Sequence, residues 1–386
     1  MKLMLVITSL GCGGAERVMT IMANYWAAKG WEITLLTFDD GTVPPFYDLH
    51  VSIVRQPLGI AGDSGNAIAA LWNNGWRIRR LRAAIAARQP NAVISFTDKT
   101  NILTLCAVRL PNCLPNRIVS STASRLQNLP IIVSERTDPS MHNIGKIWTF
   151  LRQKTYPWAD RVVTQTQAAL TYFASEIQVK GCVIPNPVLS PPDPSLNISQ
   201  TSENRSPSAI AMGRLGPEKR YDLLLKAFAR LQDRHPTWKL TVIGEGALRL
   251  ELEILRDRLG LADRVQFPGA VKDPYTVFKQ ADLFVMSSQF EGFPNALCEA
   301  MACGLPVIST DCPSGPRAII RDGIDGLLVP NGDEAALTVA MDRLMSDEGK
   351  RRRLAARAAE IVERFSLEKI MGEWESMLEE TLKERA

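Results

Sequence analysis

Short apolar runs rich in β-branched residues alternate along the chain with longer stretches of helical periodicity, and this alternation most constrains the fold. It predicts parallel sheets whose strands are joined by crossover helices. The alternation occurs in two blocks, which are separated by a stretch rich in Pro, Ser and Asn that lacks apolar periodicity. We therefore expect an α/β protein with two doubly wound αβα domains. Ligands of such sheets bind in a crevice at the carboxyl ends of the strands, so we also expect an interdomain cleft.

The two blocks predict individual strands and helices. The expected strands of the first sheet are Leu3–Ser9, Glu32–Phe38, Ala92–Phe96, Ile131–Ser134 and Arg161–Thr164. The expected strands of the second sheet are Ala209–Met212, Lys239–Ile243, Val265–Pro268, Leu283–Met286 and Val307–Ser309. Helices are expected over Ala15–Lys29, Ala67–Arg88, Tyr221–Arg234 and Leu248–Leu259.

These elements define the expected domains: 1–186, a linker over 187–208, and 209–366. The last stretch, Leu367–Arg385, carries apolar residues at helical spacing, among them Ile370 and Trp374. It predicts a C-terminal amphipathic helix that must bury one face. We expect the segment 367–386 to pack back on the first domain and complete it.

Composition and charge exclude several classes of protein. No apolar run of the 386 residues reaches the ~18 residues that a membrane-spanning helix needs. Seven cysteines without a C-x-x-C pair favour neither a disulfide framework nor a zinc site, and suit a reducing cytoplasm. Residues 1–186 hold 19 Lys and Arg against 11 Asp and Glu, whereas residues 187–386 hold 26 against 30. No nucleic-acid-binding motif accompanies the basic half, so we expect a membrane surface and no nucleic acid as its partner.

Two glycine-containing turns are candidate ligand loops. Gly13 and Gly14 lie between the first strand and the first helix, where glycines let a ligand approach the backbone and a helix N-terminus attracts an anion. The alternative is a plain tight turn. In the second domain, Gly213 and Arg214 follow the first strand, and Lys219 lies at a helix start. Two permanent cations there can neutralise a diphosphate without a metal, although a solvated charged turn is the alternative.

A third motif runs from Ser287 to Val307. Glu291 precedes a Gly-Phe-Pro-Asn turn that opens a helix, and Glu299 lies about one turn inside that helix. A helix N-terminus offers N–H groups to phosphate, and a carboxylate further along can bind the vicinal hydroxyls of ribose.

Together, the motifs resemble those of the retaining glycosyltransferases of family 4, over nearly the whole chain. The similar segments are Gly-Gly-Ala-Glu-Arg at 13–17, Gly-Arg-Leu with Glu-Lys at 213–219, Gly-Glu-Gly at 244–246, Phe-Pro-Gly at 267–269, residues 288–295, residues 299–307 and residues 311–317. Asn101, residues 134–139 and the Pro-Ser-Gly-Pro-Arg run are similar to a bacterial subgroup. That subgroup builds exopolysaccharide and lipid-linked oligosaccharide and includes amylovoran-type enzymes.

The resemblance implies a GT-B fold of two facing Rossmann-like domains and a UDP-sugar donor. Arg214 and Lys219 would bind the diphosphate, Glu299 the ribose hydroxyls, and the backbone around Val271 the uracil. Glu291 would hold the sugar and its β-phosphate together with backbone amides of the turn, which are those of Gly292, Phe293, Asn295 and Ala296. Pro294 has no N–H and can only shape that turn. Gly13 and Gly14 would approach the phosphates or the acceptor.

The implied activity is transfer of a hexose or N-acetylhexosamine to a lipid-linked or glycan acceptor, with the anomeric configuration retained. In the implied mechanism the leaving phosphate accepts the acceptor's proton, so neither a metal nor a cofactor is required. One alternative is phosphorolysis or epimerisation of a nucleotide sugar on the same fold. The other is a GT-B scaffold that binds nucleotide or carbohydrate with weak or no activity.

One departure from the family concerns a first-domain histidine that contacts the donor sugar in many relatives. The corresponding loop here reads Phe-Thr-Asp-Lys-Thr-Asn at 96–101, and none of His50, His142 and His235 fits that position in the sequence. Asp98 is our candidate for the replacement, with an exposed loop aspartate as the alternative. Glu135 and Arg136 either face the cleft or form a structural ion pair.

Two basic and aromatic stretches favour peripheral association with the inner face of the cell membrane. Residues 66–88 combine Trp72 and Trp76 with the arginines Arg77, Arg79, Arg80 and Arg82, and residues 146–158 repeat this mixture. Arginines next to tryptophans are typical of a helix that lies on anionic lipid. The alternative is an ordinary amphipathic helix whose arginines face water.

Overall fold

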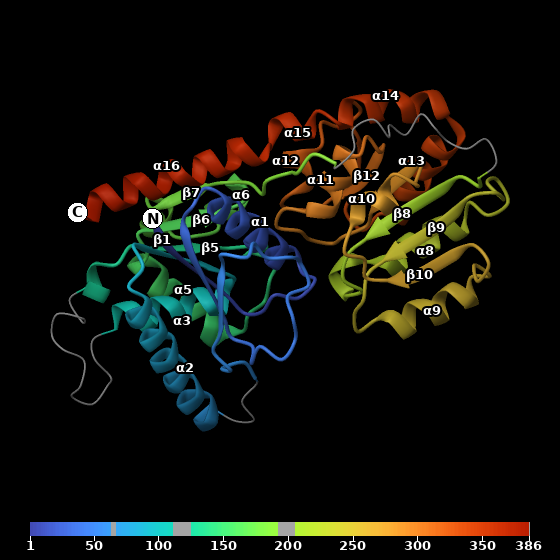
Figure 1. Ribbon diagram of the computed structural model, residues 1–386. Coiled ribbons are helices and arrows are strands. Elements are labelled where there is room, and N and C mark those ends of the chain that lie inside the picture. Colours follow the sequence, from blue (N-terminus) through green and yellow to red (C-terminus); the bar gives the residue numbers. More distant parts are fainter. Residues whose placement is uncertain (63–66, 111–124, 192–204, 386) are drawn as a thin grey trace. The chain divides into compact units, whose positions relative to one another are not determined.

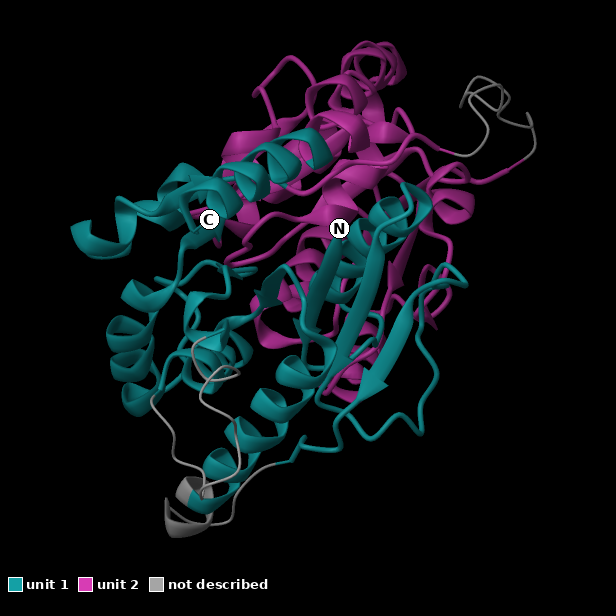
Figure 2. Cartoon of the chain, turned by 60° about the vertical axis from the view of Figure 1, so that its left-hand side comes forward, with its two compact units in different colours: residues 1–185, 371–386 teal, residues 186–370 magenta. Residues whose placement is uncertain are grey.

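The computed structural model describes residues 1–62, 67–110, 125–191 and 205–385, and for residues 67–71 only the backbone (Figure 1). The chain divides into two compact units, coloured separately in Figure 2. The first unit comprises residues 1–185 and 371–386, and the second comprises residues 186–370. Each unit is described by itself below.

A seven-stranded sheet lies at the centre of the first unit, within the part of the chain that the structure describes. Its strands are β1 (Lys2–Ile7), β2 (Glu32–Thr37), β3 (Val54–Pro57), β4 (Ala92–Phe96), β5 (Ile131–Ser134), β6 (Arg161–Thr164) and β7 (Gly181–Val183). Their order is β3-β2-β1-β4-β5-β6-β7, and every neighbouring pair is parallel. The near-continuous burial of β1, β4 and β5 follows from helices covering both faces of a parallel sheet.

Helices cover both faces of this sheet. They are α1 (Gly14–Ala28), α2 (Ala67–Arg88), α3 (Asp98–Arg109), α5 (Lys146–Thr155), η1 (Tyr156–Trp158), α6 (Gln167–Thr171), α7 (Ser175–Gln178) and α16 (Leu367–Arg385). On one face, Met4 and Val93 share a core with Leu81 of α2 and Leu105 of α3. Successive strand residues point to opposite faces, so Phe96 of β4 lies on the other face, away from α2 and α3.

The end of α16 covers that second face. The ring centroids of Trp374 and Phe96 are 6.4 Å apart, and Trp374 is buried. Lys29, just after α1, donates to Glu375 at 2.8 Å, and Arg161 of β6 donates to Glu384 at 2.6 Å. Residues 371–385 of the C-terminal helix thus pack on the first unit, as we expect from the sequence.

The second unit is built on a six-stranded parallel sheet of order β10-β9-β8-β11-β12-β13, within the described ranges. The strands are β8 (Ser208–Met212), β9 (Lys239–Ile243), β10 (Val265–Gly269), β11 (Leu283–Met286), β12 (Val307–Asp311) and β13 (Leu327–Pro330). The helices are η2 (Pro217–Lys219), α8 (Tyr221–Ala229), α9 (Arg249–Arg258), α10 (Pro274–Phe278), α11 (Asn295–Ala302), α12 (Pro316–Ile319), α13 (Glu334–Ser346), α14 (Glu348–Ala358) and α15 (Ile361–Arg364). One core joins the sheet to α8 and α13, and another joins it to α10 and α11.

Residues 186–191, which composition assigns mostly to the linker, pack on the second unit. Asn186 is buried. Val188 forms an isolated β-bridge with Ser366, and its side chain packs in the same core as Phe284. The boundaries between the two units lie between residues 185 and 186 and, inside α16, between residues 370 and 371. Residues 192–204 of the expected linker lie outside the described residues.

A buried polar network connects α3, β5 and η1 in the first unit. The Tyr156 hydroxyl donates to Glu135 Oε1 at 2.5 Å and accepts from Asn101 Nδ2 at 3.0 Å. The cation paired with Glu135 is Arg152, at 3.6 Å. Arg136 instead lies over the ring of Phe96, 4.3 Å from its centroid. The ion pair of Glu135 therefore forms with Arg152, because α5 brings that side chain under the end of β5.

Removal of the Trp374 side chain tests the packing of α16. Trp374→Ala leaves a large cavity against Phe96, so we expect the free energy of unfolding of the first unit to fall by about 3–5 kcal/mol. Urea unfolding followed by far-ultraviolet circular dichroism measures this loss. Trp72→Ala is the matched control because Trp72 is exposed. Equal unfolding midpoints for the two variants would contradict the packing.

Glu135 makes stability depend on pH. Burial is the main cause that raises its pKa from 4.5 to about 7, against the opposing charge of Arg152. Between these two pH values the folded state therefore holds a proton that the unfolded state releases. The contribution of this proton to the free energy of unfolding is complete below pH 4.5 and is lost as the pH rises to 7. Relative to Glu135→Gln, the wild type should lose about 3 kcal/mol across this interval.

Urea midpoints of wild type and Glu135→Gln at a series of pH values measure this difference. Glu176→Gln is the control, because Glu176 lies exposed on α7 of the same unit. A constant difference between wild type and Glu135→Gln from pH 4.5 to 8 would refute the assignment.

Candidate functional site

Both sheets reverse their strand order beside their first strand. In the first sheet the reversal lies between β1 and β4, and in the second between β8 and β11. In open α/β sheets, ligands bind at the carboxyl ends of the strands beside such a reversal. The loops after β1 and β4 contain Gly13, Gly14 and Asp98, and those after β8 and β11 contain Arg214, Lys219 and Glu291. These six predicted residues thus lie in the loops, or at the start of the helices, that follow the strands at each reversal point.

Arg214 and Lys219 both follow β8, but they differ in their exposure to solvent. Arg214 is 74% exposed, and it donates to Glu218 Oε1 at 2.7 Å. Burial is the largest single effect on Glu218 and raises its pKa, but the hydrogen bond from Arg214, a backbone hydrogen bond and the charges of Arg214 and Lys219 together lower this pKa below its usual value. Lys219 is only 19% exposed. Gly244 lies against this loop, where a Cβ atom would clash with the carbonyl oxygen of Gly213, so the motif requires glycine.

Lys219 and Glu291 form the central ion pair of the second unit. Lys219 Nζ lies 2.6 Å from Glu291 Oε1, which also accepts from Ser288 Oγ at 2.6 Å. Both side chains are mostly buried, although the residues are far apart in the sequence. The loop after β8 and the loop after β11 are therefore joined through charge at the reversal point.

The turn that follows Glu291 is held from several directions. Gly315 has φ +88°, and a Cβ atom there would lie 2.9 Å from Pro294 Cδ and 3.0 Å from the Gly292 oxygen. Ser314 Oγ donates to that same Gly292 oxygen at 3.3 Å. Pro294 is the N-cap residue of α11, and Asn186 Nδ2 donates to Asn295 Oδ1 at 2.6 Å. The side chain of Asn295 is therefore engaged inside the unit.

Other predicted residues of this turn contribute mainly backbone. Phe293 is buried, with its ring edge-on to Phe365 at 5.4 Å, so its side chain belongs to the core. Ala296 and Val271 are partly buried against the same core. Glu299 is 7% exposed and lies one turn into α11. The structure brings Glu291, Gly292, Pro294 and Glu299 to one end of one helix.

In the first unit, Gly13 is the N-cap residue of α1 and Gly14 its first residue. Asp98 begins α3 after Thr97, whose φ of +75° is strained for a β-branched residue. His142 Nε2 lies 3.6 Å from Asp98 Oδ2. Sequence reasoning missed this contact because His142 belongs to a different loop, the one between β5 and α5. No pattern in the sequence links the two loops.

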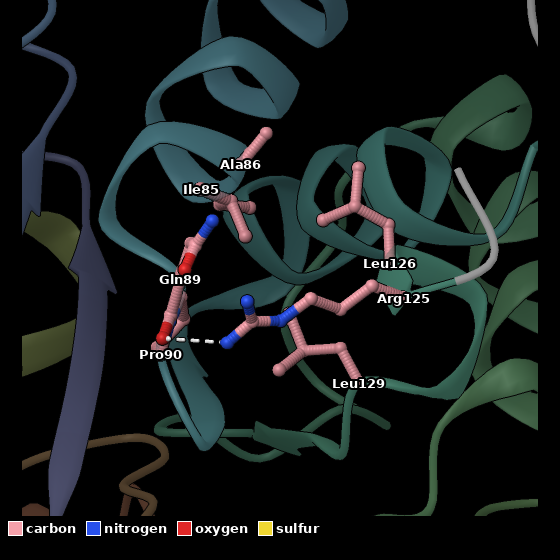
Figure 3. A pocket seen from close by; sticks show the side chains of 7 residues that line it. All are labelled: Ile85, Ala86, Gln89, Pro90, Arg125, Leu126 and Leu129. Atoms are coloured by element: carbon pink, nitrogen blue, oxygen red, sulfur yellow. Dashed lines mark hydrogen bonds between the residues drawn. The ribbon is translucent and has the colours of Figure 1, made fainter. Parts of the chain in front are cut away.

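A pocket of about 180 Å³ lies elsewhere in the first unit (Figure 3). It is lined by Ile85, Ala86, Gln89, Pro90, Arg125, Leu126 and Leu129. Gln89 and Pro90 come just before β4, so the pocket is near the amino end of that strand. It therefore lies away from the carboxyl ends that carry Gly13, Gly14 and Asp98.

The arginines of α2 are largely engaged by the protein itself. Arg77 donates to the carbonyl oxygens of Ile60 and Gly62, and Arg80 donates to that of Leu58 at 2.9 Å. Arg82 is buried and donates to Leu110 at 2.8 Å. The expectation that the arginines of this helix face lipid is thus wrong for Arg82, whereas Arg77 is half-buried and Arg79 and Arg80 are exposed. Trp72 and Trp76 are exposed, as are Ile147 and Phe150 of α5. None of the described helices has the length and apolar character needed to cross a membrane.

Two family models match the chain, one in each half. The model described as Glycosyltransferase Family 4 matches residues 12–188. The model described as Glycosyl transferases group 1 matches residues 196–361, which include Arg214, Lys219, Glu291 and Glu299.

Relatives of similar length agree with these matches. The chain is 28% identical over 383 residues, covering 98% of itself and 99% of the relative, to a Campylobacter jejuni protein. That protein is named as the alpha-1,4-N-acetyl-D-galactosaminyltransferase of GalNAc-alpha-(1->4)-GalNAc-alpha-(1->3)-diNAcBac-PP-undecaprenol. The present chain is also 23% identical to an amylovoran biosynthesis glycosyltransferase of Erwinia amylovora, and the match covers 98% of this chain and 99% of that relative.

Solved structures share the fold. A sucrose-phosphate synthase from Thermosynechococcus elongatus superposes with a TM-score of 0.81 at 18% identity, over 98% of each chain. The Anabaena protein HepE, in complex with UDP-glucose, superposes with a TM-score of 0.75 at 19% identity, over 99% of each chain. These likenesses confirm a GT-B fold with two Rossmann-like domains. The chain therefore belongs to the glycosyltransferases, with a family 4 domain in its first half and a group 1 domain in its second.

Proposed function

We propose that the protein is a retaining transferase that moves a hexose or an N-acetylhexosamine from a UDP-sugar to a lipid-linked or polysaccharide acceptor. The observation that carries the proposal is the Lys219–Glu291 pair at the reversal point of the second sheet, beside the N-terminus of α11. The acceptor class is supported by the names of two relatives, the Campylobacter jejuni transferase of an undecaprenol-linked glycan and the amylovoran biosynthesis glycosyltransferase of Erwinia amylovora. The UDP-glucose complex of Anabaena HepE supports the donor class.

The diphosphate of the donor would be bound by Arg214, Lys219 and the turn before α11. Lys219 already faces Glu291, so an incoming phosphate places a second anion beside this ammonium. Exposed Arg214 is free to turn its planar guanidinium from Glu218 toward phosphate oxygens, where bidentate binding is favourable. Backbone N–H groups at the start of α11 add partial positive charge.

This arrangement supports departure of the diphosphate without a metal or another cofactor. As the glycosidic bond breaks, negative charge develops on the β-phosphate, and preorganised cations and amides stabilise that charge. Attack on the same face of the sugar lets the leaving phosphate take the proton of the acceptor hydroxyl. Glu291 would accept hydrogen bonds from donor-sugar hydroxyls, and Glu299 from the ribose.

We also propose that the first unit binds the inner face of the cell membrane, where a lipid-linked acceptor would lie. Arg82 gives this proposal no support because it is buried, whereas Arg79 and Arg80 are exposed. What remains is a set of exposed apolar side chains on two helices that each adjoin α3, with basic residues among them. They are Trp72 and Trp76 of α2 and Ile147 and Phe150 of α5.

Nucleotide binding tests the donor proposal. Isothermal titration of UDP, GDP and ADP without divalent metal should show binding of UDP alone. Glu299→Ala removes a charged hydrogen-bond acceptor for ribose, which is worth about 1.5–3 kcal/mol, so the Kd for UDP should rise roughly 10- to 100-fold. Glu251→Ala is the control, because Glu251 is exposed on α9 of the same unit.

Each failure has a different meaning. Absence of binding by any nucleotide would overturn the transferase proposal in favour of an inactive scaffold. Equal affinity of Glu299→Ala and wild type would remove Glu299 from the ribose site while leaving the donor class intact. Release of free sugar phosphate from a UDP-sugar would favour phosphorolysis over transfer.

Vesicle flotation tests the membrane proposal. The protein should float with vesicles of phosphatidylcholine and phosphatidylglycerol, less with phosphatidylcholine alone, and less at high salt. Replacing both Trp72 and Trp76 by Ser should lower the partition coefficient at least roughly tenfold, because each indole buries apolar area in the interface. Val179→Ser, at an exposed apolar position after α7, should change nothing. Equal flotation of the double variant and wild type would contradict a role for α2.

A further inference from the structure

The pocket shown in Figure 3 lies where the C-terminal end of α2 meets residues 125–129, which precede β5. Its volume of about 180 Å³ is similar to that of an apolar cavity of about 150 Å³ that holds benzene. Four of its seven described lining residues are buried: Ile85, Pro90, Leu126 and Leu129. Gln89 and Arg125 are exposed. The pocket therefore has an apolar base and a polar mouth that reaches solvent.

The apolar walls belong to the core of the first unit. Three of the lining residues share one buried cluster, and a fourth packs against that cluster: Ile85, Leu126, Leu129 and Ala86. The Gln89 N–H donates to the Ile85 oxygen at 3.2 Å, which holds the end of α2. The N–H of Asn91 donates to the Lys2 oxygen of β1 at 2.8 Å. The walls are therefore fixed by contacts with the rest of the unit.

Arg125 carries the positive charge at the mouth of the pocket. Its guanidinium reaches toward Gln89, where Nη2 donates to the carbonyl oxygen at 3.4 Å (Figure 3). This distance is longer than the usual range of about 2.7–3.2 Å for such a bond. Residues 99–134 contain no Asp or Glu, and no carboxylate of the described residues pairs with Arg125. The charge at the mouth is thus not neutralised by the described part of the chain.

Two nearby arginines differ from Arg125 because the protein itself uses their donors. Arg109 donates to the Gln127 oxygen at 2.6 Å and pairs with Asp160 at 2.8 Å. Arg88, the last residue of α2, donates to the side-chain oxygen of Gln56 at 3.0 Å. A guanidinium has five N–H donors, and Arg125 gives one of them to a described partner. Its other donors are available to a ligand in the pocket.

We propose that this pocket binds a small amphipathic carboxylate. The carboxylate would lie on the guanidinium of Arg125, whose planar fork matches two carboxylate oxygens. The apolar part would lie against Ile85, Leu126 and Leu129, where each methylene that leaves water favours binding. Arg125 is the single cation among the described lining residues, so a monoanion matches the charge better than a phosphate dianion does.

This site goes beyond the proposed function and does not depend on it. The pocket lies near the amino end of β4, whereas the loops assigned to the transfer reaction follow the carboxyl ends of the strands. A carboxylate that binds there is therefore a second kind of ligand, separate from the donor and the acceptor.

Methyl NMR of the full chain tests the pocket. The protein is deuterated and labelled with ¹³C in the Ile δ1 and Leu methyl groups, and Ile85→Val and Leu129→Met assign two resonances from the pocket. Ile210→Val assigns a reference methyl that is buried in the second unit. The probes are hexanoate and benzoate, with 1-hexanol and benzyl alcohol as their uncharged counterparts.

We expect at least one of the two carboxylates to shift the Ile85 and Leu129 resonances with saturation, while the Ile210 resonance stays in place. The matching alcohol should bind at least roughly tenfold more weakly, because it cannot form the charged hydrogen bonds to Arg125. The apparent Kd of each probe is obtained from the same titrations.

Three variants separate the contributions of charge and shape. Arg125→Gln should remove the preference for the carboxylate over the alcohol. Arg88→Gln is the matched control and should keep that preference, because Arg88 lies close in the fold but donates to Gln56. Ala86→Leu, whose fold is checked by circular dichroism, fills the pocket and should weaken binding of both probes.

Unmoved Ile85 and Leu129 resonances with both carboxylates would overturn the site. Equal affinity of wild type for a carboxylate and its alcohol would overturn the role of Arg125 and the class of ligand. An equal loss of affinity in Arg125→Gln and Arg88→Gln would trace binding to the general positive charge of the surface, and would also overturn the site. UDP is not a probe here, so failure of the donor proposal leaves this result unchanged.

Discussion

The reversal of strand order beside the first strand of each sheet is the constraint on which the functional geometry depends. Because β2 and β3 extend the first sheet one way and β4 to β7 the other, the loops after β1 and β4 cannot cover each other. The same holds for β8 and β11 in the second sheet. Short polar loops therefore stay at the carboxyl ends of buried strands, where the rigid sheet positions them.

At the second reversal point, two opposite charges stabilise each other. Lys219 and Glu291 are largely removed from solvent, so each would be costly to bury without the other. Their pairing also joins loops that follow two different strands. An anionic ligand that approaches Lys219 must compete with a carboxylate already bound there, which favours a ligand whose polar groups also satisfy Glu291. A phosphate attached to a hydroxylated sugar has both kinds of group.

How much of the site was predictable depends on how far apart its parts lie in the sequence. Strands β4, β5 and β11 follow directly from continuous apolar runs, and the turn before α11 is one contiguous motif. Strands β3 and β7 were not predicted, because Val-Arg-Gln-Pro and Gly-Cys-Val carry no alternation long enough to read. The pairing of Glu135 with Arg152 and the engagement of the α2 arginines by carbonyl groups depend on tertiary packing.

The two units therefore build their polar sites by different means. In the second unit, glycine at 244 and at 315 permits the close approach of loops that are separate in the sequence. In the first unit, the strained backbone of Thr97 is held by hydrogen bonds to Ser134 and Asn101, and Asn101 is joined through Tyr156 to Glu135. A change anywhere in that network would move Asp98 and the turn of His142 together.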